Sequence, residues 1–338
     1  MWPDVFDPEN LNPDASLNKL VIGPVSGAQP AHVGANGGDL LGRDAIVRLV
    51  QHRCGVVVRH DAVSDWLVDA MEADPSGGPA AVVEEMGDRL ASLVATLRDP
   101  GSAESATGGR RTYLEVWQNL DLVILGGGLM KGAVGERVAA RAGAVLATGR
   151  AAAPAVRVAL YPVWLPLLGA ARSARGNDSL VIVLDCGQTS LKRGVALIRG
   201  ERLVSVRVFA SLPVTAVRAS DLPLFVALAV RELREHHVGT ASQVVVSVAS
   251  YIDNGRSVPD PGSIYEQLDP AVMQSRFGIP LHLMHDGSAA WRGLGADAPS
   301  AVIMLGTWLG VGIGPHREPL RPYSSDFCVR TEGSGAAG

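Results

Sequence analysis

The spacing of hydrophobic residues predicts that helices and strands alternate along this chain. Apolar residues between Val82 and Leu97 recur every three or four positions, which is the pattern of a helix with one buried face. That helix is expected to end at Asp99-Pro100, because proline cannot continue it. Short apolar runs predict strands, three of them in close succession after Ser179 as in a β-meander, and others at 120–128, 156–161, 243–250, 280–285 and 300–305. Strands that alternate with helices, together with a meander, predict an α/β fold.

Composition and charge exclude several classes of protein. The 338 residues are enough for two lobes or one large α/β domain, and 47% hydrophobic with 19% charged residues excludes a disordered chain. The net charge of −4, without a basic block, gives no indication of a nucleic-acid partner. The three cysteines are far apart in the sequence, which argues against a disulfide framework and against a structural zinc site.

The sequence contains no segment that resembles a targeting signal or a membrane span. The first fifteen residues are acidic and contain prolines, unlike a signal or transit peptide. The longest uncharged stretches, 158–171 and 298–315, are interrupted by prolines or glycines. We therefore expect a cytoplasmic protein with no membrane partner.

The segment Asp185–Gly194, between two apolar strands, is the most informative candidate for chemistry. A carboxylate at a strand end, followed by Gly187, Thr189 and Lys192 in a tight turn, suits a site for phosphate and Mg²⁺. Gly187 allows backbone N–H groups to approach phosphate oxygens, Thr189 adds a hydroxyl donor, and Asp185 can hold Mg²⁺ through water. Taken alone, this segment is explained equally well by an ordinary hairpin loop with a polar tip.

Two glycine-rich turns are further candidates. Gly306 and Thr307 follow an apolar strand, and such a turn can present N–H groups and the Thr307 hydroxyl to a terminal phosphate. Gly126-Gly127-Gly128 lies after a buried strand and before a helix, where a flat ring or a ribose can lie against the backbone. Lys131 departs from the G-x-G-x-x-G pattern, so a Rossmann dinucleotide site is not expected. Taken alone, the 306–307 turn is more simply interpreted as a plain hairpin.

Asp286 stands at the end of a predicted strand and the start of a predicted helix. A carboxylate there is well placed to accept a proton from a substrate hydroxyl. The simpler interpretation of this position by itself is an aspartate that caps the helix.

Together these segments resemble the ROK (repressor, open reading frame, kinase) family of sugar kinases, within the hexokinase/actin/heat-shock-protein ATPase superfamily. Asp185–Gly194 resembles the first phosphate motif of the family, D-x-G-G-T-x-x-x-x-G, and Gly306-Thr307 resembles the second, G-T-G-x-G. His285-Asp286 resembles the N-D-A-N segment, whose aspartate is the catalytic base. The glycines at 126–128 resemble the adenosine motif, and 162–174 resembles the closing helix. The resemblance implies a two-lobed actin-like ATPase (ribonuclease H-like) fold that uses ATP and Mg²⁺.

The order of the segments differs from that of the family. There the phosphate motifs come first and the adenosine motif with the closing helix comes last, whereas here the last two precede Asp185. This order implies a circular permutation, in which residues 175–179 join the old ends. The division that follows is an irregular N-terminal arm (1–38), the first part of a nucleotide-side lobe (39–161), a crossing helix and linker (162–178), a substrate-side lobe (179–299), and the second part of the nucleotide-side lobe with a tail (300–338).

Several residues depart from the family pattern. Gln188 replaces a glycine of the first phosphate motif, and Trp308 stands where its bulk can crowd a phosphate. His285 and Ser288 replace two asparagines, one of which binds the sugar in the family, and Ser250-Tyr251 replaces a Pro-Gly beside the substrate. The resemblance thus implies Ser250, Tyr251 and His285 as substrate contacts. The E-x-G-H sugar motif and the zinc motif of the family have no counterpart, so a substrate other than glucose is expected.

The resemblance implies an ATP-dependent kinase that phosphorylates a hydroxyl of a sugar, amino sugar or cyclitol. Asp286 would accept the proton of the attacking hydroxyl, while the Asp185–Lys192 turn and Gly306-Thr307 would hold the transferred phosphoryl group. Two other classes stay open: a catalytically inactive, sugar-binding regulatory protein, and an interaction module of the actin kind. A homodimer is compatible with the resemblance, because members of the family are often dimers.

Overall fold

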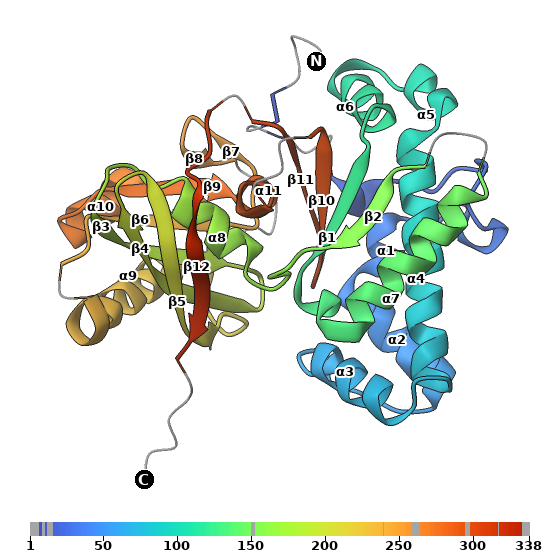
Figure 1. The fold of residues 1–338 in the computed structure, drawn as a ribbon, viewed down its shortest axis with the longest axis horizontal. Coiled ribbons are helices and arrows are strands. Elements are labelled where there is room, and N and C mark those ends of the chain that lie inside the picture. Colours follow the sequence, from blue (N-terminus) through green and yellow to red (C-terminus); the bar gives the residue numbers. More distant parts are fainter. Residues whose placement is uncertain are drawn as a thin grey trace. The chain divides into compact units, whose positions relative to one another are not determined.

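The computed structural model describes residues 7–8, 11, 16–149, 153–238, 240–258, 264–294, 298–316 and 318–332. The chain divides into two compact units, of which unit 1 comprises Met1–Trp164 with Ala296–Pro315 and unit 2 comprises Leu165–Gly295 with His316–Gly338. Each unit combines helices with one main sheet of mixed strand direction (Figure 1), which confirms the α/β prediction. Within the described segments, no helix combines the length and the apolar character needed to cross a bilayer.

The sheet of unit 1 has four strands in the order β11-β10-β1-β2. The central strand β1 is parallel to both of its neighbours, whereas β10 and β11 form an antiparallel hairpin. The strands are β1 (Leu122–Gly126), β2 (Ala155–Val158), β10 (Ser300–Leu305) and β11 (Leu309–Gly314). The helices are α1 (Gly37–Leu41), α2 (Arg43–Cys54), α3 (Val63–Ala73), α4 (Gly78–Arg98), α5 (Pro100–Ser105), α6 (Gly108–Gln118) and α7 (Gly132–Ala147).

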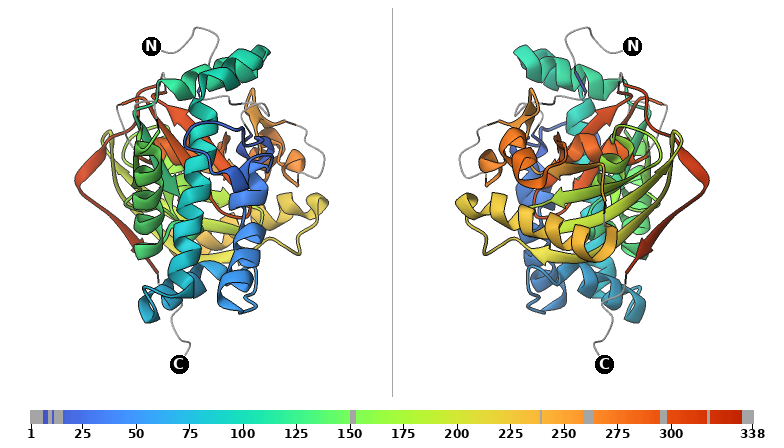
Figure 2. Two further views of the ribbon diagram at one scale, coloured as in Figure 1. Left: turned by 90° about the vertical axis from the view of Figure 1, so that its right-hand side faces the viewer. Right: turned by 90° about the vertical axis from the view of Figure 1, so that its left-hand side faces the viewer.

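The helix predicted from the apolar spacing of residues 82–97 is α4, which is the long central helix of unit 1. Its apolar positions are buried, and it packs against α2 and α7, which lie beside it in the views of Figure 2. The helix ends at Arg98, directly before Asp99-Pro100, as predicted from the proline. The Asp99 carboxylate then accepts the N–H of Ser102 at 2.8 Å and caps the next helix, α5.

The sheet of unit 2 has six strands in the order β12-β5-β4-β3-β6-β9. The antiparallel strands β3, β4 and β5 form the predicted meander, and β6 and β9 continue the sheet in parallel beside β3. The strands are β3 (Ser179–Cys186), β4 (Ser190–Arg199), β5 (Arg202–Pro213), β6 (Gln243–Val248), β9 (Leu281–His285) and β12 (Tyr323–Thr331), with a small hairpin of β7 (Ile252–Asp253) and β8 (Arg256–Ser257). The helices are α8 (Leu165–Arg172), α9 (Leu222–Leu233), α10 (Pro270–Phe277) and α11 (Asp286–Leu294).

The two sheets share one pattern of strands. In unit 2 the pattern starts with the β3–β4 hairpin and continues with two parallel strands, β6 and β9, on the other side of β3. In unit 1 the β10–β11 hairpin is flanked in the same way by β1 and β2 on the other side of β10. In unit 2 the hairpin precedes the two parallel strands in the chain. In unit 1 the order is reversed, because β1 and β2 come before the β10–β11 hairpin.

The tail of the chain, which the sequence prediction names without placing it in a lobe, belongs to the sheet of unit 2. Its strand β12 pairs in parallel with β5 (Figure 1). The Tyr323 hydroxyl donates to the carbonyl of Gly293, and the Arg172 guanidinium lies 4.6 Å from the Tyr323 ring centre. These contacts, and the open edge of β5 that β12 covers, explain why the tail joins this sheet.

The parallel strands β3, β6 and β9 position the residues of unit 2 that carry candidate chemistry. Asp185 is in register with Ser247, and Ser247 is in register with Met284, two residues before Asp286. Because parallel strands end at the same edge of a sheet, the two aspartates leave one edge together.

Helix α11, which begins at Asp286, is held by a close crossing with α8. A Cβ atom added at Gly169 of α8 would lie 1.7 Å from the carbonyl oxygen of Ala289 in α11. A Cβ atom at Gly293 would lie 2.4 Å from the carbonyl oxygen of Leu165. The small residues of the predicted closing helix therefore allow the two backbones to touch.

We predict that Gly169→Ala destabilises the protein by about 3 kcal/mol or more, because the new methyl group meets backbone that cannot move aside. Thermal unfolding followed by circular dichroism should show a loss of roughly 10 °C in Tm. The matched control is Gly143→Ala in α7, where no atom lies within 4 Å of the added Cβ and where alanine favours the helix. Equal Tm values for the two variants would contradict the close crossing.

Candidate functional site

The residues that the sequence singles out fall into two groups, one in each unit. Unit 2 contains Asp185, Lys192 and the His285-Asp286 pair, and unit 1 contains the glycines at 126–128 and the Gly306-Thr307 turn. Asp185 and His285-Asp286 lie at the carboxyl ends of β3 and β9, on either side of β6, and Lys192 lies opposite Asp185 near the start of the antiparallel strand β4. The two glycine turns of unit 1 follow the carboxyl ends of the neighbouring strands β1 and β10. Ligand sites of open α/β sheets are found at such strand ends.

Asp185 is buried at the end of β3, with both carboxylate oxygens engaged. The Lys192 ammonium, across the β3–β4 hairpin and in register with Asp185, donates to Oδ2 at 2.7 Å. The hydroxyl of Ser247 on β6 donates to Oδ1 at 2.8 Å. A buried carboxylate needs such partners, and Lys192 supplies the opposite charge. Sequence reasoning missed Ser247, although a single serine within the apolar strand QVVVSV was a usable signal.

Asp286 is the first residue of α11, and its side chain is 22% exposed. Removal from water raises the pKa of its carboxyl group to about 7, and the negative charge of Asp185 acts in the same direction. The Gly287 N–H, which donates to Oδ1 at 2.7 Å, and the charge of Lys192 both oppose the rise. Asp286 therefore combines a raised pKa with a face that a reactant can reach, the combination expected of a general base near neutral pH.

His285 lies next to Asp286, and the Tyr251 ring packs on His285. The two rings are stacked, with their centres 5.2 Å apart and their planes 15° from parallel. The Ser288 N–H donates to Nδ1 of His285 at 3.3 Å, and Nε2 lies 3.3 Å from Oδ1 of Asp286. Burial lowers the pKa of the imidazole to about 4, so the ring is neutral near pH 7.

The third predicted substrate contact, Ser250, has a different environment. Its side chain is buried, and its hydroxyl lies 2.8 Å from that of Ser257 on β8. This pair ties the segment after β6 to the small β7–β8 hairpin. Ser250 thus supports the loop that carries Tyr251.

The turn between β3 and β4 uses its own polar groups. The Gly187 N–H donates to the carbonyl of Ser190 at 3.0 Å, and the carbonyl of Thr189 accepts the Val214 N–H at 3.0 Å. The Gly187 N–H therefore closes the hairpin.

In unit 1 the triple glycine lies against the end of β10. Gly126 is in register with Met304, and a Cβ atom added at Gly127 would lie only 2.2 Å from the carbonyl oxygen of Leu305. Gly127 has φ +94°, a backbone conformation that side chains disfavour, and its N–H donates to the carbonyl of Pro162 at 2.8 Å. Close approach of two strand ends thus explains the central glycine, and it brings the 126–128 turn beside Gly306.

Arg43, which sequence reasoning missed, connects these two turns. It is the first residue of α2, and its backbone N–H donates to the carbonyls of Gly306 (3.0 Å) and Thr307 (3.3 Å). Its guanidinium Nη2 lies 4.0 Å from the position of a Cβ atom at Gly128. Burial lowers the pKa of this guanidinium, while the carboxylates of Asp61 and Asp44 raise it. A cation therefore lies beside the glycine turns of unit 1.

Trp308 is accommodated by the helix α1. Its side chain is 52% exposed, and its ring approaches within 3.1 Å of where a Cβ atom at Gly38 would stand. The side-chain amide of Asn18 makes two hydrogen bonds to the backbone of the next residue, Leu309, at 2.8 and 2.9 Å. The indole of Trp308 thus lies against α1 at Gly38, where a residue larger than glycine would crowd the ring.

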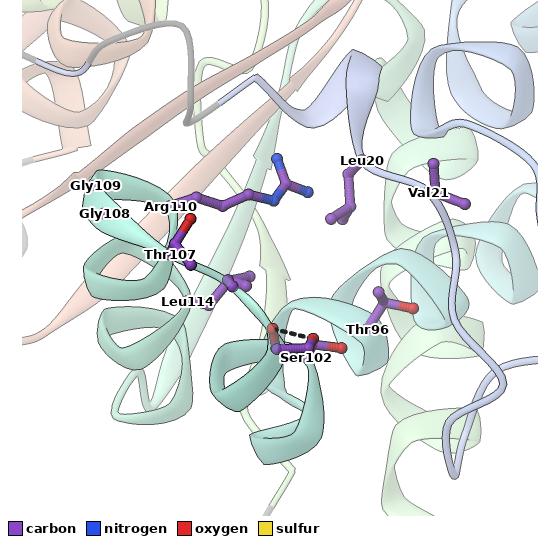
Figure 3. A pocket seen from close by; sticks show the side chains of 11 residues that line it. Leu20, Val21, Thr96, Ser102, Thr107, Gly108, Gly109, Arg110 and Leu114 are labelled. Carbon is purple, nitrogen blue, oxygen red and sulfur yellow. Dashed lines mark hydrogen bonds between the residues drawn. The ribbon is translucent and has the colours of Figure 1, made fainter.

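A separate pocket of about 690 Å³ lies in unit 1 between the end of α4 and the α5–α6 segment (Figure 3). Polar residues such as Thr96, Ser102, Thr107 and Arg110 line it together with Leu20 and Leu114. None of the residues that the sequence singled out belongs to this lining.

Possible metal ligands among the described residues include their acidic, histidine and cysteine side chains. In the part of the chain that the structure describes, no three His, Cys, Asp or Glu side chains are grouped to hold a metal ion. A magnesium ion at Asp185 would therefore take most of its ligands from water and from phosphate oxygens, which is the usual pattern for this ion.

We predict that Asp286→Asn stabilises the fold at pH 8. The folded-state pKa of about 7 lies above the ordinary value of about 3.9, so the folded protein holds more protons than the unfolded chain between these values. The stability of the parent protein should then fall as pH rises from about 4 to about 7, and the variant should escape this loss. Tm measured from pH 4 to 8 should show a difference that grows with pH; a constant difference would contradict the raised pKa.

Comparison with known proteins gives matches among solved structures. No protein-family model and no curated protein matches the chain. A ROK family glucokinase from Streptomyces griseus, in complex with glucose and AMPPNP, is similar with 26% identity and a TM-score of 0.33, over 42% of this chain and 48% of that one. A ROK hexokinase from Thermus thermophilus has 21% identity and a TM-score of 0.31, over 40% and 46%. The ethanolamine utilization protein EutJ from Carboxydothermus hydrogenoformans has 17% identity and a TM-score of 0.30, over 52% and 65%.

The chain spans about half the length of the two sugar kinases that it matches. Its similarity to ROK-family sugar kinases thus covers about two fifths of the chain. The division into two units, each with the same strand pattern, agrees with the predicted two-lobed actin-like ATPase fold.

Proposed function

We propose that this protein is an ATP-dependent kinase that phosphorylates a hydroxyl group of a small polyol, with Asp286 as the catalytic base. The observation that carries the proposal is the carboxyl group of Asp286, whose pKa is raised to about 7 beside the Asp185–Lys192 pair. A base with this pKa is partly ionised at neutral pH and still has a useful proton affinity.

The reaction requires one proton to move and one phosphoryl group to change partners. Asp286 takes the proton of the attacking hydroxyl, whose oxygen forms a bond to the terminal phosphorus while the bond to the bridging oxygen of ADP breaks. The Gly287 N–H holds Oδ1 of Asp286 and so limits rotation of the carboxylate at the start of α11. Most of the rate then comes from alignment and from stabilisation of charge.

Asp185 and Lys192 fit a role next to a hydrated magnesium ion. Both oxygens of Asp185 already accept hydrogen bonds, from Lys192 and Ser247, so the carboxylate suits contact through water. Magnesium, when bound, would neutralise charge on the phosphate oxygens. In the absence of ligand, the positive charge of Lys192 would offset the repulsion between the negative charges of Asp185 and Asp286.

We assign the contacts with the nucleotide to unit 1. Gly306-Thr307 and the 126–128 turn lie side by side there, and Arg43 adds a cation beside them. Glycine backbone next to a guanidinium suits a polyanionic ligand. An adenine nucleotide is the ligand that the resemblance of these turns to the adenosine and second phosphate motifs implies.

The acceptor that we propose is a sugar, amino sugar or cyclitol, bound beside the stacked pair of Tyr251 and His285. Aromatic faces pack against the C–H surfaces of such rings, and neighbouring polar groups select hydroxyls. An inactive regulatory protein is the second candidate. This candidate is favoured by the hydrogen bond from the Gly187 N–H to the Ser190 carbonyl, because an N–H that closes the hairpin does not bind a phosphate.

We also propose that the chain is a circular permutant of the two-lobed kinases. The shared strand pattern of the two sheets supports this, because in unit 1 the completing strands β1 and β2 precede the starting hairpin β10–β11 in the chain.

Magnesium-dependent formation of ADP from ATP, measured against pools of sugars, amino sugars and cyclitols, should reveal an acceptor. Asp286→Asn should lower kcat by about 10²–10⁴-fold while nucleotide affinity stays the same, because only the base is lost. The rate should rise with pH through about 7 as Asp286 ionises. Nucleotide binding without turnover in any pool would favour the regulatory protein, and the absence of nucleotide binding would contradict the kinase.

A further inference from the structure

We propose that His285 is a positioning residue for Asp286: its imidazole is fixed as the Nε2–H tautomer and donates that proton to Oδ1 of the carboxylate. The proposal rests on the proposed function, in which Asp286 is the base. It assigns to His285 a task other than contact with the acceptor.

The backbone determines the tautomer of the ring. The Ser288 N–H donates to Nδ1 at 3.3 Å, and a backbone N–H can only donate. Nδ1 must therefore present its lone pair, so a neutral imidazole carries its proton on Nε2. The Ser288 hydroxyl, 3.4 Å from Nδ1, can rotate and does not compete with this assignment.

The Nε2 proton has the carboxylate of Asp286 as its neighbour. Nε2 lies 3.3 Å from Oδ1, the same oxygen that accepts the Gly287 N–H at 2.7 Å. Two donors on Oδ1 lower the proton affinity of that oxygen. The proton of the attacking hydroxyl is thereby directed to Oδ2, where the new O–H bond forms as the O–H bond of the acceptor breaks.

The ring is held rigidly enough for this task. Its side chain is 8% exposed, and the Tyr251 ring is stacked on it at 5.2 Å. Burial keeps the pKa of His285 at about 4, so neither of its hydrogen bonds is lost by protonation near neutral pH. Among the described residues, the charges of Asp185 on β3 and Lys192 on β4 act on Asp286, and the charge of Asp286 raises the pKa of Tyr265.

Two substitutions separate positioning from packing. The amide nitrogen of glutamine can occupy the place of Nε2, so His285→Gln retains a donor to Asp286. Asparagine reaches only the place of Nδ1, so His285→Asn retains an acceptor for the Ser288 N–H but loses that donor. Both replacements are polar, uncharged and close in size, so they form a matched pair.

The first test needs neither substrate nor turnover. Nitrogen-15 NMR of the intact protein, with His285 assigned by comparison with His285→Gln, should show one Nε2–H tautomer from pH 5 to 8. The Nε2 proton resonance should move when Asp286 is replaced by asparagine, because its carboxylate partner is lost. An Nδ1–H tautomer, titration of the ring near pH 6.5, or a proton unaffected by Asp286→Asn would overturn the proposal.

The second test uses kinetics once an acceptor is known. His285→Asn should lower kcat by about 10- to 100-fold, the value of a hydrogen bond to a charged group, and should move the acidic limb of the pH–kcat profile upward. His285→Gln should restore kcat to within about threefold of the parent enzyme and restore the profile. Equal losses in both variants with an unchanged profile would show a packing role only. If no acceptor exists, the proposed function fails, whereas the NMR result still decides the position of the proton.

Discussion

The site of unit 2 depends on the burial of the Asp286 carboxyl group beside a second carboxylate at one edge of a sheet. Asp185 and Asp286 leave the ends of β3 and β9, the parallel strands on either side of β6, and the negative charge of Asp185 raises the energy of charging Asp286. Lys192 compensates by pairing with Asp185 at 2.7 Å, and Ser247 and Gly287 supply hydrogen bonds. Asp185 thereby has a full set of partners, while Asp286 is left with a raised pKa and an accessible face.

The scaffold supports this arrangement by close backbone contacts. The crossing of α8 and α11 at Gly169 fixes the helix that starts at Asp286, and the meander places Lys192 opposite Asp185. Unit 1 repeats the same strand pattern and brings its glycine turns together at the ends of β1 and β10. One architectural rule, candidate residues at the carboxyl ends of parallel strands, therefore operates in both units.

Local patterns in the sequence predicted much of this, and long-range pairing determined the rest. The periodicity of α4, the meander and the strand before Asp286 follow from neighbouring residues, and so does a polar turn after Asp185. The roles of Ser247 and Arg43 depend on which strand or turn lies beside them, which no local pattern specifies. The strand β12 joins unit 2 because β5 has an open edge, and the Gly187 N–H closes its own turn. Both of these interactions depend on which backbone groups lie opposite each other in the folded chain.

We propose that Asp286 is a base, and its proton affinity is set by burial, by the negative charge of Asp185 and by the opposing charge of Lys192. The most direct measurement of this claim is a carbon-13 NMR titration of the Asp286 carboxyl group in the intact protein and in Lys192→Met. We predict a pKa of about 7 in the parent protein and a higher pKa in the variant, because the compensating charge is lost. An ordinary aspartate pKa in the parent protein, or no change on removal of Lys192, would contradict it.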